Sequence, residues 1–135
     1  MEAIQVNDQI MQQLGEKWIQ ALLDKDYQHL AEICQPDVRS RLMTPRHIDS
    51  FENAADLTQK VESWFHDYSS PKKVQTHVTR IGEKLSINYW LGFIRGEGFF
   101  TAEQQVYCSL RDGLIDQISL LCSGFQSLQT PIEMP

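Results

Sequence analysis

The chain has 135 residues, 41% of them hydrophobic and 22% charged, with a formal net charge of −6, as in an ordinary water-soluble globular protein. This acidic balance disfavours nucleic acids and anionic membranes as partners, and no apolar run approaches the roughly 18 to 20 residues that span a bilayer. The N-terminal residues lack the basic and then apolar pattern of a signal peptide, so we expect a cytoplasmic protein.

Two helices are expected at the start of the chain. Residues 9–23 place apolar side chains, Trp18 among them, at helical spacing. Gly15 inside this helix costs up to about 1 kcal/mol relative to alanine, which suggests that another part of the backbone passes close by. A shorter helix follows, with Asp26 as its N-cap and Pro36 at its end.

A strand and a third helix come next. Residues 38–43 alternate apolar and polar side chains, as a half-buried strand does. A loop then leads to Asn53, the expected N-cap of a helix that carries Trp64 on its apolar side. The Ser-Ser-Pro sequence at 69–71 is expected to stop this helix.

The second half of the chain has the period-two pattern of strands. Four strands are expected, joined as an antiparallel meander, at residues 74–81, 85–94, 103–110 and 114–122. The separation of helices from strands predicts an α+β domain in which three helices pack on one curved sheet. We expect a single domain over residues 1–135, with its core at about 8–126 and a loose tail at 127–135.

The sequence resembles the nuclear transport factor 2-like superfamily, which includes ketosteroid isomerases, SnoaL-like polyketide cyclases and scytalone dehydratase. The resemblance rests on LLDKDYQHLAEICQPDV after the first helix, on AADLTQKVESWF, on THVTRI, and on DGLIDQI near the end. It implies three N-terminal helices packed on a curved, mostly antiparallel sheet that forms a cone-shaped half-barrel. It also implies an apolar pocket between helices and sheet, open at one end, but no particular activity.

The catalytic residues of this superfamily are only partly matched. Where ketosteroid isomerases carry an aspartate base, this chain has Arg41 and Leu42, and the oxyanion-hole positions correspond at best to Trp18 and Gln105. Scytalone dehydratase has a histidine at the position similar to His77. The resemblance therefore implies at most an incomplete catalytic set.

His77 and Tyr107 are the candidate catalytic residues. A histidine titrates near neutral pH, so His77 can act as an acid or base if it faces the pocket. Alternation along its strand also allows the opposite interpretation, in which His77 lies on an outer, solvated or interface side. The sequence does not decide which face of the sheet lines the pocket.

Five further residues are candidates for ligand binding. Arg41 would select a carboxylate or enolate if it reached the pocket, although an arginine is more often solvated at a rim. Aromatic side chains favour a small apolar or aromatic ligand, or else they simply form the core. The candidates are Trp18, Arg41, Trp64, Tyr89 and Gln105.

Adjacent residues Tyr89 and Trp90 must face opposite sides of their strand. Similar apolar loading on both sides of residues 85–94 predicts that both faces of the sheet are covered, one by the helices and the other by a second subunit. We therefore expect a homodimer that associates through the sheet.

No cofactor and no metal are expected, because no set of histidines and carboxylates has ligand spacing. Three widely spaced cysteines support neither a disulfide framework nor a zinc site, and they are expected to be small buried residues: Cys34, Cys108 and Cys122.

Asp112 and Asp116 flank Gly113 and could be mistaken for an acid pair. A three-residue loop with a glycine bulge, which pairs Leu110 with Leu114, gives better agreement of the apolar faces than a two-residue loop. Asp112 and Gly113 are then turn residues, and Asp116 is expected at the solvated surface.

Two functions remain open. The first is a SnoaL-like pocket protein that acts as an isomerase, cyclase or dehydratase on a small apolar or aromatic molecule without a cofactor. The alternative is a non-catalytic ligand-binding or dimerisation module of the same fold.

Overall fold

The computed structural model describes residues 8–129, which form three helices and one seven-stranded sheet. In chain order the elements are α1 (Asp8–Asp24), α2 (Tyr27–Glu32), β1 (Cys34–Met43), β2 (Ile48–Phe51), α3 (Ala54–Phe65), β3 (Ser69–Ile81), β4 (Lys84–Arg95), β5 (Gly98–Arg111), β6 (Leu114–Cys122) and β7 (Gln126–Leu128). The strand order is β2-β1-β6-β5-β4-β3, with β7 paired to β5. Strands β1 and β6 run parallel, whereas the meander from β3 to β6 is antiparallel, as predicted.

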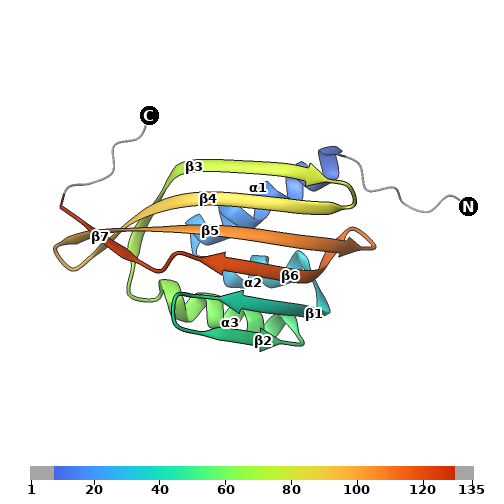
Figure 1. Ribbon diagram of the computed structural model, residues 1–135, viewed down its shortest axis with the longest axis horizontal. Coiled ribbons are helices and arrows are strands. Elements are labelled where there is room, and N and C mark those ends of the chain that lie inside the picture. Colours follow the sequence, from blue (N-terminus) through green and yellow to red (C-terminus); the bar gives the residue numbers. More distant parts are fainter. Residues whose placement is uncertain (1–7, 130–135) are drawn as a thin grey trace, which may run out of the picture.

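All three helices lie on the same side of the sheet (Figure 1). Helix α1 packs on β3 and β4, and α2 and α3 pack on β1. We call the covered side the inner face and the opposite side the outer face. The expected α+β architecture, with helices on one side of a curved, mostly antiparallel sheet, is confirmed. Within residues 8–129, no helix has the length and apolar character needed to cross a membrane.

Helix α1 forms where the apolar spacing predicts it, and its buried side includes Leu14, Trp18 and Leu22. Gly15 is also buried, and a Cβ atom added to it would lie 2.5 Å from Cγ1 of Val78 on β3. A close neighbour is present, but it is the Val78 side chain and not the backbone that was predicted. It draws α1 tightly onto the edge of the sheet.

The second helix ends earlier than predicted. Asp26 caps it as expected, accepting a hydrogen bond of 3.1 Å from the backbone N–H of His29. The helix ends at Glu32, however, and Pro36 lies inside β1. Proline is tolerated in this strand because the register between β1 and β6 is broken between Cys34 and Arg39, so no regular ladder bond is lost there.

The chain between β1 and α3 contains the short strand β2, where a loop was predicted. Helix α3 begins as expected: the Asn53 side chain accepts a hydrogen bond of 2.8 Å from the backbone N–H of Asp56. The helix ends at Phe65, and the Ser-Ser-Pro sequence at 69–71 opens β3 instead of ending the helix. Strand β7 also lies where a loose tail was expected, and residues 130–135 of that tail fall outside the described residues.

The two sides of β4 differ more than predicted. The inner side is apolar and at most 4% exposed: Leu85, Ile87, Tyr89, Leu91 and Phe93. The outer side is mostly only partly buried, and its five residues within 85–94 include just two large apolar ones: Ser86, Asn88, Trp90, Gly92 and Ile94. The expectation of similar apolar loading on both sides of this strand is therefore wrong.

The hairpin between β5 and β6 has a two-residue loop, and the predicted three-residue loop is wrong. Asp112 and Gly113 have φ angles of 54° and 81°, both in the left-handed region that a type I′ turn requires. Leu110 accordingly pairs with Ile115 and not with Leu114. The turn roles predicted for the aspartate and the glycine are confirmed.

A bulge one step beyond the turn restores the agreement of the apolar faces. The register shifts between Ser109 and Leu110, so that Ser109 pairs with Gln117 and Asp116 is the extra residue. Asp116 is half-buried and accepts a hydrogen bond of 2.7 Å from the Ser109 hydroxyl. It is a structural residue of the bulge, less solvated than expected.

Candidate functional site

The space between helices and sheet is occupied by a chain of hydrogen-bonded side chains. The indole N–H of Trp18 on α1 donates to the Tyr89 hydroxyl on β4 at 2.9 Å, and that hydroxyl donates to Oε1 of Gln104 on β5. The amide of Gln104 in turn donates to the sulfur of Cys122 at 3.3 Å. These four side chains are between 0% and 4% exposed. Trp18 and Tyr89, expected in the pocket wall, thus fill the interior.

The titratable groups of this interior are held in their neutral forms. Burial raises the pKa of Tyr89 well above its ordinary value, an effect only partly offset by the hydrogen bond from Trp18. Burial likewise raises the pKa values of the Cys34 and Cys108 thiols to about 12. All three groups stay protonated near neutral pH, so they offer no general base. Within residues 8–129, no three or more His, Cys, Asp or Glu side chains are grouped so that they could hold a metal ion.

His77 and Tyr107 lie on the outer face, opposite this interior. His77 pairs with Asn88, and Tyr107 pairs with Ser86, both on the outer side of β4. The two candidates are separated by two strand spacings and by two residues along the sheet, which corresponds to about 12 Å between their Cα atoms. A direct proton relay would require their side-chain atoms to approach within about 3 Å of each other.

The ligand-binding candidates are divided between the two faces. Arg41 and Gln105 are exposed on the outer face, and Trp64 on α3 is half-buried against the core. Three candidates, His77, Tyr89 and Gln105, border one hollow of about 250 Å³, whose other lining residues are Gln75, Thr76, Asn88, Trp90 and Glu103. The predicted set therefore does not converge on one pocket.

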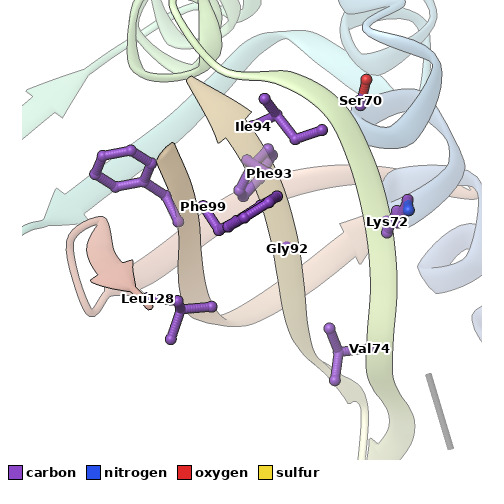
Figure 2. A pocket seen from close by; sticks show the side chains of 9 residues that line it. Ser70, Lys72, Val74, Gly92, Phe93, Ile94, Phe99 and Leu128 are labelled. Atoms are coloured by element: carbon purple, nitrogen blue, oxygen red, sulfur yellow. The ribbon is translucent and has the colours of Figure 1, made fainter. Parts of the chain in front are cut away.

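One apolar hollow bordered by residues 8–129 is small. It lies at the end of the sheet where Gly92, Ile94, Phe99 and Leu128 meet β3, and it has a volume of about 40 Å³. Figure 2 shows its side chains coming from β3, β4, β5 and β7. Pockets for drug-sized ligands measure roughly 300 to 1,000 Å³, so this hollow accepts at most one small group.

An aromatic cluster closes the inner side of the same end. Tyr68, in the connection before β3, stacks on Phe125 with ring centroids 3.9 Å apart, and both rings also contact Phe93. The guanidinium of Arg95 lies 5.4 Å from the centre of the Tyr68 ring. Sequence reasoning missed Tyr68 and Phe125, because neither belongs to a periodic segment.

Two larger hollows are polar. One, of about 430 Å³, runs between α1 and β3 and includes Glu16, Lys73 and His77. The other, of about 310 Å³, lies over β1, β2 and β6 and includes Arg39 and Arg41. The sequence suggested that these two arginines share one side of a strand, but not that β2 would border them.

No protein-family model and no curated protein sequence matches this chain, but solved structures share its fold. A candidate polyketide cyclase from Xanthomonas campestris matches with a TM-score of 0.72 and 14% identity, covering 86% of this chain and 92% of that one. A nuclear transport factor 2-like protein from Burkholderia xenovorans gives 0.65 and 11%, covering 88% and 93%. An LEH-like epoxide hydrolase of M. tuberculosis gives 0.64 and 10%, covering 85% and 84%. These likenesses show the nuclear transport factor 2-like fold.

Proposed function

We propose that this protein of the nuclear transport factor 2-like fold is a homodimeric small-molecule-binding module and not an acid–base catalyst. The observation that carries the proposal is the separation of the two faces. The interior holds a neutral, self-satisfied network of Trp18, Tyr89 and Gln104, whereas both catalytic candidates, His77 and Tyr107, lie on the other side of the sheet.

The competing isomerase, cyclase or dehydratase requires an acid or base beside an enclosed substrate. Related structures are named as a polyketide cyclase and an epoxide hydrolase, which supports a role with small molecules in general. In this chain the apolar hollow of about 40 Å³ is too small for an aromatic substrate, and it contains no histidine or carboxylate. Binding is therefore favoured over turnover.

Large exposed apolar residues on the outer face support the homodimer. Four large hydrophobic side chains are 45% to 61% exposed: Ile48, Ile81, Tyr107 and Leu121. The strand registers place all four on the outer face, where none of the helices of residues 8–129 covers them. A standard interface buries about 800 Å² on each partner, roughly a tenth of the 8267 Å² surface of this chain. The outer face therefore offers a suitable surface for a second copy.

A cytoplasmic location is part of the proposal. Cys34, Cys108 and Cys122 are all buried free thiols. A reducing compartment keeps thiols in this state, whereas secreted proteins usually pair them.

Sedimentation velocity at micromolar concentration tests the dimer. We expect the wild type to sediment as a dimer and Leu121→Glu to sediment as a monomer, because the substitution puts a charge among the exposed hydrophobic side chains of the outer face. Gln13→Glu, which adds the same charge at an exposed position of α1, is the matched control and should remain dimeric. A monomeric wild type contradicts the proposal.

The absence of catalysis has its own test. We expect His77→Ala and Tyr107→Phe to change the affinity for any molecule that the protein binds by less than about threefold, and mass spectrometry to find that molecule unaltered after incubation. Turnover by the wild type that either substitution abolishes would establish the catalytic alternative.

A further inference from the structure

Two arginines share the outer side of β1. Arg39 and Arg41 are both exposed and lie two residues apart, so their Cα atoms are about 6.6 Å from each other on the same face. Arg39 pairs with Gln117 on β6, and Arg41 pairs with Ser119 on β6 and with Ser50 on β2. Polar side chains from two neighbouring strands therefore surround the two guanidinium groups.

Neither guanidinium is neutralised by the described part of the chain. Three other cations there have a carboxylate within 3.5 Å: Lys60 with Asp49, Arg80 with Asp8, and Arg111 with Asp37. No ion pair or hydrogen bond joins the guanidinium group of Arg39 or Arg41 to any group of residues 8–129, Glu52 beside them included. The chain carries 18 acidic residues against 12 basic ones, and Arg39 and Arg41 are among the basic side chains of residues 8–129 that have no carboxylate partner there.

The arginines border a defined hollow of about 310 Å³, lined also by Ser50, Gln117 and Ser119. The side-chain hydroxyl and amide groups of these three residues can donate hydrogen bonds, and within residues 8–129 no hydrogen bond already engages those side-chain groups. Guanidinium groups present planar forks that bind carboxylate and phosphate oxygens in pairs. The hollow thus combines two fixed positive charges with neutral donors.

The geometry points to a binding site for a small dianionic oxyanion, a short dicarboxylate or a phosphate, held between Arg39 and Arg41 on the outer face. Two guanidinium groups carried on the same face by Cα atoms about 6.6 Å apart can each bind one end of a short dicarboxylate, and they can also converge on one phosphate. The volume is ample for either. A nucleic acid is a poor match, because two cations on a chain of net charge −6 do not attract a polyanion.

Glu52 provides a second test of the charge of the ligand. Its carboxylate lines the same hollow and repels an anion placed there. Removal of this charge by Glu52→Gln is therefore expected to tighten anion binding. A ligand with a positive group would respond in the opposite way.

This inference rests on the proposed binding role and names a ligand class for it. The hollow lies beside Leu121 on the face proposed for the dimer, but the site needs no residue of the second copy. Isothermal titration with succinate and, separately, with inorganic phosphate at constant ionic strength tests it, with sodium chloride as the blank. We expect saturable binding of at least one of them, weakened at least about tenfold by Arg39→Gln or Arg41→Gln and strengthened by Glu52→Gln. Tighter binding of succinate indicates a carboxylate ligand, and tighter binding of phosphate indicates a phosphate ligand.

Arg46→Gln is the matched control, because Arg46 is an exposed arginine of the same region outside the hollow, and this variant should bind like the wild type. Equal weakening by Arg46→Gln overturns the site, since it indicates a general field effect. Absence of binding in both arms also overturns it. If the arginine variants lose dimerisation in sedimentation while neither anion binds, the guanidinium groups pair with a second copy, which overturns the anion site and leaves the homodimer standing.

Discussion

The contact between Gly15 and Val78 allows a sharp test of how α1 is held on the sheet. In an isolated helix, Gly15→Ala is stabilising by about 1 kcal/mol, because alanine restricts the unfolded chain and favours the helix. In this fold the added Cβ would lie 2.5 Å and 2.8 Å from the two methyl groups of Val78, and 3.2 Å from its Cβ. The helix propensity and the packing therefore act in opposite directions.

The packing effect is expected to exceed the propensity effect. Overfilling a packed site costs about 1 to 3 kcal/mol, and Val78 cannot turn away, because both its methyl groups and its Cβ lie within 3.2 Å of the new atom. We expect Gly15→Ala to lower the free energy of unfolding by about 1 kcal/mol. Val78→Ala alone should cost about 1 to 2 kcal/mol through the loss of two methyl groups.

Urea unfolding of the wild type, both single variants and the double variant measures the coupling between the two positions. Once Val78 is alanine, Gly15→Ala should be neutral or stabilising, which gives a coupling free energy of about 1 to 2 kcal/mol. Gln13→Ala, at an exposed position of the same helix, should behave alike in both backgrounds. A stabilising Gly15→Ala in the wild-type background, or equal effects in both backgrounds, refutes the proposed contact.

Two further predictions concern the buried polar groups. Tyr89→Phe leaves the Trp18 indole N–H and the Gln104 carbonyl without their partner, so we expect the urea-derived free energy of unfolding to fall by about 2 kcal/mol or more; an unchanged value shows that the network contributes nothing. The raised pKa of the Cys34 and Cys108 thiols, about 12 against an ordinary value of 9.0, means that above pH 9 only the unfolded chain loses these protons. Stability should therefore decrease as the pH rises from 9 towards 12, and the decrease should be smaller in the Cys34→Ala/Cys108→Ala variant; identical pH profiles contradict the assignment.

Local sequence patterns were sufficient for the long elements. Helix α1 carries its buried residues at regular helical spacing over 17 residues, and Asn53 supplies an unambiguous N-cap for α3. Strands β3 to β6 alternate strongly because one of their sides packs on helices. In each of these segments, propensity, spacing and capping all favour the same structure.

Elements defined by pairing with distant strands were not predictable in this way. Strand β2 has four residues and β7 has three, and each exists because an edge of the sheet is available to it. Pro36 is compatible with a strand only because the β1–β6 register is interrupted at that point. The bulge at Asp116 depends on two requirements together: the two-residue turn at Asp112 and the matching of the apolar sides of β5 and β6. Each can be recognised in the sequence, but the bulge that satisfies both cannot.

The candidate functional site was also only partly predictable from the sequence. Side-chain direction along a strand is fixed by parity, so Val38 and Leu42 in the core require that Arg39 and Arg41 point to the outer face. Parity can be deduced from the sequence, but the face on which the helices pack cannot, because it depends on the whole topology. A shift by one residue would bury two guanidinium groups in the core, at a cost that no available partner offsets. The same apolar positions that fill the interior therefore place these two arginines on the outer face, which is why we propose binding rather than enclosed catalysis.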